Sequence, residues 1–180
     1  MTMREEGTSD GDAGGNTADT VDSVTFTDAK PRTGLSSDSS PVVRHGIDLV
    51  SIERIASLLA EFGESFRDRA FTKSERAYCD RQGTPAQHYA ARWAAKEAFC
   101  KTLDAASPAI PLDSVAVVRK RADPHLRLEP PATEAFGRML ARRNVSPETV
   151  ELAVSLSHDK DAGYAIGSVT VFSIDSSLDE

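Results

Sequence analysis

The 180-residue sequence has only two cysteines, Cys79 and Cys100, one tryptophan and no long apolar run. The cysteines form no Cys-x-x-Cys pair, which argues against a disulfide framework or a cysteine metal cluster and indicates reduced thiols. No stretch approaches the roughly 20 apolar residues that a membrane helix needs. The first residues have neither the apolar core of a secretory signal nor the arginines of a transit peptide. We therefore expect a cytoplasmic protein that is not exported and not embedded in a membrane.

The chain also lacks an excess of basic residues, since 21 Lys and Arg stand against 28 Asp and Glu, for a net charge of −7. A general nucleic-acid binder needs a concentrated basic surface to neutralise phosphates, so nucleic acid is not an expected partner. Residues 1–40 hold 8 acidic and 3 basic side chains, which leaves the rest of the chain at about −2. That near-neutral remainder can still carry a local anion site.

Residues 1–40 are rich in Gly, Ser, Thr and Asp and show neither helical nor strand periodicity. Such a composition is typical of a disordered segment. We expect a disordered acidic extension over residues 1–40, one folded domain over 41–175 and a short tail over 176–180. A chain of this length fits one domain better than two.

The apolar pattern of the folded part predicts one strand, several helices, two strands, a helix and two final strands. The links within the strand pairs are of hairpin length and leave no room for parallel crossovers, so we expect a single α+β domain with a mainly antiparallel sheet and packed helices. A turn is expected around Asp123-Pro124, and a capping box with proline at the first helical position is expected at Thr84. We expect strands over residues 42–50, 114–120, 125–129, 150–156 and 164–174. A short helix should follow Ser51, a second should begin at Thr72 or Ser74, a third should begin at Thr84, and a last helix should cover 132–143.

Three segments carry residues from which a phosphate-handling site could be built. The first, Gly46–Arg54, places the single carboxylate of Asp48 inside an apolar strand. Burying an acid there is costly unless a cation or several hydrogen bonds compensate. Asp48 could equally lie on the solvent face or cap a neighbouring helix, since exposed acids are common in strands.

The second segment, Arg92–Lys101, belongs to the clearest expected helix. At 100° per residue Glu97 and Lys101 project from one face close to Trp93, so an acid and a base lie beside an aromatic ring. The acid could hold a metal and the lysine could contact phosphate. Glu and Lys four residues apart are also a common surface pair worth about 0.2–0.5 kcal/mol, and spacing alone favours that simpler interpretation.

The third segment, Ser155–Asp161, gathers polar residues where a strand meets its hairpin turn. Loops at strand ends often carry function, although turns are also simply polar. The order Ser157, His158, Asp159 is weak evidence for a hydrolase triad, because triad members meet in space and adjacent strand residues point in opposite directions.

In this order the three segments resemble the signature of the holo-acyl-carrier-protein synthases, the short-chain 4′-phosphopantetheinyl transferases. The family pattern has a Gly-x-Asp with an Arg six residues after the Asp, then a helix with Trp/Phe-x-x-Lys-Glu-x-x-x-Lys, then Ser-x-Ser-His. The resemblance spans about residues 43–171, and the order and spacing strengthen each short match. The matching residues are Gly46, Asp48, Arg54, Trp93, Lys96, Glu97, Lys101, Ser155, Ser157 and His158.

The resemblance implies the 4′-phosphopantetheinyl transferase-like fold and a Mg²⁺-dependent transfer of 4′-phosphopantetheine from coenzyme A to a serine of apo acyl carrier protein. Adenosine 3′,5′-bisphosphate would be the second product. Asp48 and Glu97 are implied to bind Mg²⁺ together with the pyrophosphate, which suits an ion that commonly uses one or two carboxylates plus phosphates. Glu97 is also the first candidate for the general base, and Lys101 would add positive charge. The implied coenzyme A contacts are Arg92, Lys101, Ser157 and His158.

The resemblance further implies that Arg54 faces the acidic helix of the carrier protein, where complementary charge speeds encounter and sets orientation. A surface arginine paired with Glu53 is the simpler alternative. The family also implies homotrimers in which each active site is completed at a subunit interface, of which the sequence carries no independent sign.

The sequence departs from the family after the catalytic helix. Many members have a Gly-Thr-Gly turn that approaches phosphate, whereas residues 102–108 here are Thr-Leu-Asp-Ala-Ala-Ser-Pro. Backbone amides need the freedom of glycine for close phosphate approach, so we expect the grip on the nucleotide to differ. Two alternatives stand beside the transferase: a non-catalytic relative that binds carrier protein without Mg²⁺, and a Mg²⁺-dependent phosphohydrolase that acts on coenzyme A alone.

Overall fold

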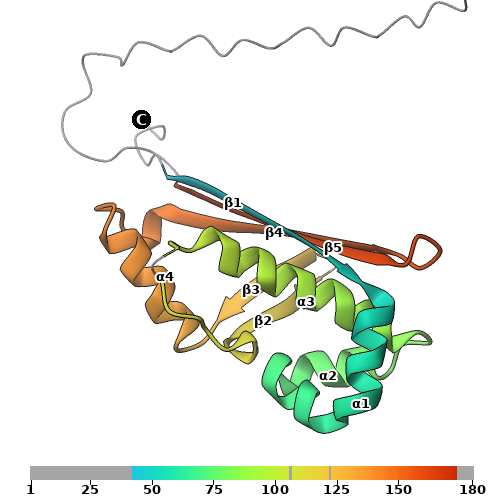
Figure 1. Cartoon of the computed structure of the whole chain (residues 1–180). Helices are drawn as coiled ribbons and strands as arrows, with labels where there is room; N and C mark the ends of the chain where they lie inside the picture. The colour runs from blue at the N-terminus through green and yellow to red at the C-terminus, as the bar shows by residue number, and fades with distance from the viewer. Residues whose placement is uncertain (1–41, 106, 122, 174–180) are drawn as a thin grey trace, which may run out of the picture. The chain divides into compact units, whose positions relative to one another are not determined.

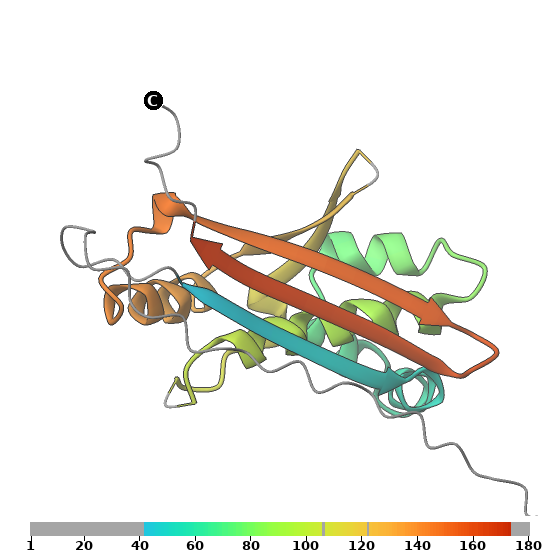
Figure 2. The same cartoon turned by 90° about the horizontal axis from the view of Figure 1, so that it is seen from above.

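Three antiparallel strands lie side by side in the order β1 (Val43–Ser51), β5 (Tyr164–Ser173) and β4 (Val150–Asp159), seen from the side in Figure 1 and from above in Figure 2. Helix α3 (Pro85–Thr102) packs against one face of this sheet, mainly against β1 and β5. The structure, a computed structural model, describes residues 42–105, 107–121 and 123–173. The predicted extension over 1–40 and the tail over 176–180 lie outside these residues.

The remaining elements pack around α3 and complete one compact unit. The predicted α+β fold with a mainly antiparallel sheet is confirmed. Within the described ranges, no helix is long and apolar enough to cross a membrane. The other elements are α1 (Ile52–Ala70), α2 (Lys73–Cys79), the hairpin of β2 (Val115–Lys120) and β3 (Asp123–Leu128), α4 (Ala132–Ala141), and the 3₁₀ turns η1 (Leu112–Ser114) and η2 (Pro147–Thr149).

Two strand glycines allow the sheet to approach α3 closely. A Cβ added at Gly46 of β1 would collide with the Ala98 carbonyl oxygen, and one at Gly167 of β5 would collide with the backbone at Ala95. Because α3 presents a row of fully buried alanines to the sheet, helix and strand backbones come nearly into contact. Gly46 thereby fixes the height above α3 of Asp48, which lies two residues further along β1.

The predicted helix start at Thr72 is confirmed, whereas the cap at Thr84 and the length of the first helix differ from the prediction. Thr84 makes no side-chain capping bond, since its backbone (φ −133°, ψ 76°) lies outside the usual N-cap geometry. A full capping box forms instead at Thr72, whose hydroxyl accepts from Glu75 N at 3.3 Å while the Glu75 carboxylate accepts from Thr72 N at 2.9 Å. The helix after Ser51 is 19 residues long rather than short, because it continues past a kink at Gly63, where φ is 49°.

The β2–β3 turn also lies earlier than predicted. Arg121 adopts a left-handed backbone (φ 59°) and makes the turn, so Asp123 and Pro124 are the first residues of β3 instead. Helix α4 ends at Ala141, two residues before the expected end, and Asn144 with φ 54° follows. Asn is one of the few residues that tolerate this conformation.

Candidate active site

Two carboxylates, Asp48 on β1 and Glu97 on α3, lie close together at the edge of the sheet. Asp48 is on the α3 side of β1, with 19% of its side chain exposed. Lys101, one turn after Glu97, donates from Nζ to Asp48 Oδ1 at 2.9 Å and to the Ile47 carbonyl at 2.8 Å. Lys101 therefore bridges α3 to β1 and compensates the acid of the apolar strand.

The environment of Glu97 favours a bound cation. Partial burial raises the pKa of Glu97, and the neighbouring Asp48 carboxylate raises it further, while Lys101 and Arg54 act in the opposite direction. Like-charged carboxylates that share a site repel one another, and a divalent cation between them removes that repulsion. No group of three or more His, Cys, Asp or Glu that could hold a metal occurs among residues 42–105, 107–121 and 123–173. A pair of carboxylates that leaves room for water and phosphate fits Mg²⁺.

A cavity of about 600 Å³ opens beside Glu97 and Lys101. Its far wall is the segment after α3, where the Gly-Thr-Gly turn is missing. The wall is mostly apolar and the end near the carboxylates is charged, which suits a ligand with a charged head and a less polar arm. The wall includes Leu103, Asp104, Ala105, Ser107, Pro108 and Ile110.

Arginines fix this wall in place of a flexible glycine turn. Arg143 donates to both oxygens of Asp104, at 2.5 and 3.1 Å, and lowers the pKa of that carboxyl. Arg44 of β1 donates to the Thr102 and Leu103 carbonyls at 2.8 and 2.9 Å, so it satisfies acceptors that the end of α3 leaves open. The added acid is therefore a structural tie between the α3 terminus and α4.

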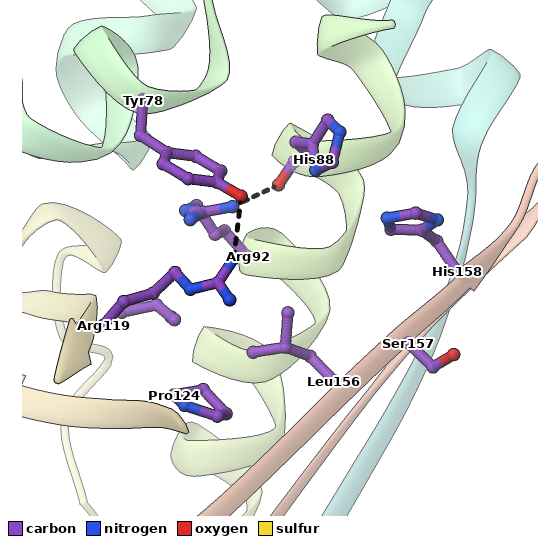
Figure 3. Close-up of a pocket in the computed structure, with 9 residues that line it drawn as sticks. Tyr78, His88, Arg92, Arg119, Pro124, Leu156, Ser157 and His158 are labelled. Atoms are coloured by element: carbon purple, nitrogen blue, oxygen red, sulfur yellow. Dashed lines mark hydrogen bonds between the residues drawn. The ribbon is translucent and has the colours of Figure 1, made fainter. Parts of the chain in front are cut away.

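A second cavity, of about 310 Å³, lies on another side of α3 (Figure 3). Arg92 lines it and lies five residues before Glu97, so the two side chains project about 140° apart around the helix axis. His158 of β4 also lines it, with its ring 5.0 Å from that of His88 in an edge-to-face arrangement. Ser157 belongs to the same wall, but its side chain points away from the cavity in Figure 3.

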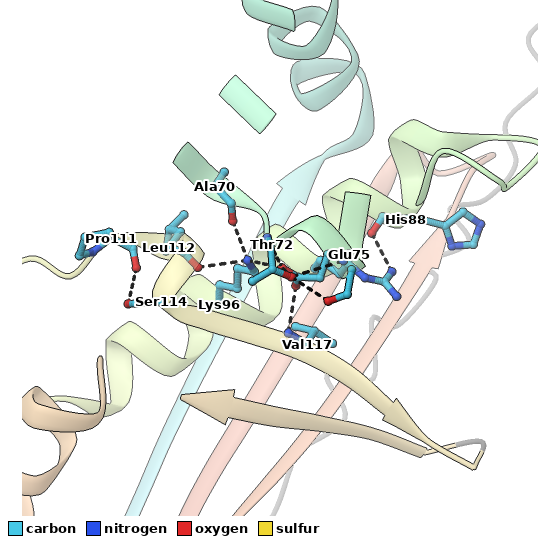
Figure 4. A network of polar contacts seen from close by, with 11 residues as sticks. Ala70, Thr72, Glu75, His88, Lys96, Pro111, Leu112, Ser114 and Val117 are labelled. Carbon is cyan, nitrogen blue, oxygen red and sulfur yellow. Dashed lines mark hydrogen bonds and ion pairs between the residues drawn. The ribbon is translucent and has the colours of Figure 1, made fainter. Parts of the chain in front are cut away.

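Lys96, the first lysine of the motif, takes part in neither cavity and is completely buried (Figure 4). Its Nζ donates to Glu75 Oε2 at 2.7 Å and to the Ala70 and Leu112 carbonyls at 2.6 and 3.1 Å. The other Glu75 oxygen accepts from Val117 N at 2.9 Å. The pair thus ties α3 to the end of α1, to α2, to η1 and to β2.

Arg54 lies in a third groove, of about 510 Å³, along α1. The groove combines apolar side chains with two arginines, and Phe62 is 46% exposed. In the described part of the chain Arg54 has no ion pair with Glu53, and its charge acts on the nearby Glu97. The groove therefore presents a basic and apolar surface. It is lined by Arg54, Leu58, Phe62, Phe66, Arg69 and Trp93.

Comparison with known proteins shows which family has this arrangement. Residues 44–160 match the 4′-phosphopantetheinyl transferase superfamily. The chain belongs to this family. The holo-[acyl-carrier-protein] synthase of Syntrophus aciditrophicus is 38% identical over 125 residues, which is 67% of this chain and 90% of that protein. The synthase of Myxococcus xanthus is 38% identical over 67% of this chain and 88% of its own length.

Solved structures agree with the assignment to this transferase family. The coenzyme A complex of the Chronobacterium ammoniagenes synthase has a TM-score of 0.59 and 27% identity, over 74% of this chain and 98% of that one. The Neisseria meningitidis synthase has a TM-score of 0.57 and 25% sequence identity, over 71% of this chain and 96% of that one. The predicted resemblance, the fold and the enzyme class are therefore confirmed.

The transferase fold groups the predicted site residues into two separate sets. Glu97 and Lys101 line the first cavity, with Asp48 bound to Lys101, while Arg92 and His158 line the second. Sequence reasoning did not identify Tyr78, His88 and Arg119 as residues of the second cavity. His88 could have been found, since it lies one helical turn before Arg92, whereas the other two reach the cavity only through the tertiary fold.

Proposed function

We propose that this chain transfers 4′-phosphopantetheine from coenzyme A to a serine of apo acyl carrier protein and releases adenosine 3′,5′-bisphosphate, in a Mg²⁺-dependent reaction. The paired carboxylates of Asp48 and Glu97 with Lys101 beside them, in a family with a coenzyme A complex, carry this proposal. Cys79 and Cys100 are free, which agrees with a cytoplasmic location for the reaction.

In the proposed reaction the carrier serine oxygen attacks the β-phosphorus of coenzyme A, and the bond from that phosphorus to the bridging oxygen of the pyrophosphate breaks. Asp48 and Glu97 would hold Mg²⁺, which when bound supplies positive charge to the phosphate oxygens. Lys101 adds a second positive charge at the same place, and Arg44 with Asp104 keeps the cavity wall fixed. Glu97 is the proposed acceptor of the serine proton.

Intact-mass spectrometry of apo acyl carrier protein incubated with this chain, coenzyme A and Mg²⁺ tests the proposal. We expect the carrier to gain the mass of one phosphopantetheine, and we expect a chelator to prevent the gain. Free phosphopantetheine produced without a carrier would indicate a phosphohydrolase instead. Carrier binding with no mass gain would indicate the non-catalytic relative.

We propose the α1 groove as the surface that receives the acidic carrier protein. Arg54→Glu should raise the KM for the carrier roughly tenfold or more, since it places a like charge against an acidic partner. The affinity for coenzyme A should change little. Arg138→Glu on α4, another exposed arginine, is the matched control and should leave both constants near wild type. An equal loss of coenzyme A affinity in Arg54→Glu would contradict the partner-contact role.

We also propose a homotrimer in which the two charged sets of one active site come from different copies. The sheet face opposite α3 supports this, because it exposes a patch of large apolar residues, with Val43 at 71% and Leu49 at 62%. The two charged sets lie on different sides of α3, which also supports an active site shared between copies. The patch consists of Val43, Ile47, Leu49, Tyr164 and Ile166.

The double variant Ile47→Glu/Leu49→Glu should be a folded monomer without transfer activity. Two charges in the apolar patch of each copy would prevent the patch from being buried against another copy. Light scattering after size exclusion measures the mass, and circular dichroism checks the fold. Phe62→Glu, another exposed apolar residue on α1, should leave the oligomer intact. A wild-type chain that is already monomeric while fully active would rule out the shared site.

A further inference from the structure

The cavity of Figure 3 holds a buried donor that lacks an acceptor. Arg92 is 4% exposed, and its Nε has no hydrogen-bond partner in the described part of the chain. The Arg92 guanidinium lies 4.1 Å from the centre of the Tyr78 ring and donates from Nη1 to the His88 carbonyl at 3.2 Å. Because buried donors are normally paired, the unpaired Nε–H shows that the hydrogen-bonding capacity of Arg92, a residue that lines this cavity, is not used up within the described chain.

Positive charge converges on the same cavity from several elements. Arg119 of β2 donates from Nη1 to the Tyr78 hydroxyl at 3.0 Å and lines the cavity beside Arg92. His88 of α3 and His158 of β4 face each other across its other side. No acidic residue occurs among the described residues that line the cavity. Such a set of donors without a carboxylate fits a phosphate group.

These surroundings disfavour the charged form of His88. Burial lowers the pKa of His88 below its ordinary value, and His158, Arg92 and Arg119 lower it further. The Tyr78 ring lies 5.9 Å from that of His88, and the Gln87 amide nitrogen lies 3.5 Å from its Nε2. A phosphate dianion placed among these cations would reverse the effect of their charge and favour the imidazolium.

We propose that His88 and Arg119 are further coenzyme A-binding residues, which hold the 3′-phosphate of its ribose together with Arg92, and that His88 takes up a proton when this phosphate binds. The inference rests on the proposed function, in which Asp48 and Glu97 already engage the pyrophosphate, so that the 3′-phosphate is the group left to be bound. The proposed trimer allows the cavity and the carboxylates to come from different copies.

The direction of the pH dependence follows from this linkage. The pKa of His88 lies below its ordinary value in the free protein and rises when phosphate is bound. Between those two values binding takes up a proton, so affinity falls as pH increases through the bound-state pKa. His88→Gln keeps a hydrogen-bonding side chain of similar size but cannot titrate, so it should lose this dependence.

Titration calorimetry of the wild-type chain with adenosine 3′,5′-bisphosphate near neutral pH tests the proposal. The observed enthalpy should differ between two phosphate-free buffers of different ionisation enthalpy, by the amount that proton uptake requires. Adenosine 5′-phosphate, which lacks the 3′-phosphate, should bind roughly tenfold or more weakly and without this difference. The buffer dependence of the enthalpy should change between wild type and His88→Gln by the proton that His88 takes up, and because the ligand is the same in both titrations its own protonation cancels in that difference.

Arg119→Met should reduce the preference for coenzyme A over dephospho-coenzyme A, which differ only in the 3′-phosphate. The same net proton exchange in wild type and His88→Gln would overturn the role of His88. An unchanged preference in Arg119→Met would overturn the role of Arg119. The mass assay on the same wild-type sample separates the two proposals: transfer without proton uptake rejects this inference alone, and absence of coenzyme A binding rejects the proposed function with it.

Discussion

Glu97→Gln should reduce phosphopantetheine transfer by about 10³-fold, because in the proposed mechanism it removes one of the two carboxylates that would hold Mg²⁺ and also the proposed proton acceptor, while it keeps the side-chain shape. The chain should stay folded. The pKa of Glu97 is raised in the folded protein, so ionisation of this group opposes folding as pH increases from its unfolded value through its folded value. Glu97→Gln removes that contribution, and its melting temperature at neutral pH should therefore equal or exceed that of wild type.

The measurement is the initial rate of carrier mass gain over a range of Mg²⁺ concentrations, together with a thermal melt of each variant. Asp48→Asn should show a comparable loss of activity, and it also leaves Lys101 without its carboxylate partner. Glu148→Gln, in the 3₁₀ turn η2 and outside the first cavity, is the control and should retain full activity. Wild-type turnover of Glu97→Gln at limiting Mg²⁺ would remove this residue from the metal site.

Much of the fold could be predicted because its signals are local. Each element buries one face, and that requirement sets its apolar pattern in the sequence. The strand is therefore visible in the alternation from Val150 to Leu156, and the helix in the apolar spacing of residues 132–143. The length of α1 could not be predicted, since a kink at Gly63 permits the helix to continue where a pattern predicts only a short one. The hairpin turn was misplaced because Asp-Pro is a strong turn signal, whereas Arg121 takes the left-handed position that the turn requires.

The site shows the same division between local and tertiary information. Helical spacing placed Glu97 and Lys101 on one face, but it could not show that Lys101 pairs with Asp48, 53 positions earlier in the chain. Spacing also gave no reason for Gly46, whose missing Cβ is needed only once α3 packs under β1. The carboxylate pair and the Arg92 cavity lie on different sides of α3. Their separation depends on which face of α3 each strand covers, and that is determined by the packing of the whole core.

Lys96→Met should produce the largest loss of stability, about 3–5 kcal/mol in the free energy of unfolding, because it leaves the Glu75 carboxylate buried without its cation. Both side chains of this pair are 0% exposed. The double variant Lys96→Met/Glu75→Gln removes the uncompensated charge and should recover a large part of the loss, which urea denaturation of the single and double variants measures. Lys101→Met, at an exposed lysine of the same motif, should change stability by less than about 1 kcal/mol and yet impair transfer. If Lys96→Met kept wild-type stability but bound coenzyme A more weakly, the lysine would have to act on the substrate, and α3 would have to be held by its alanine face alone.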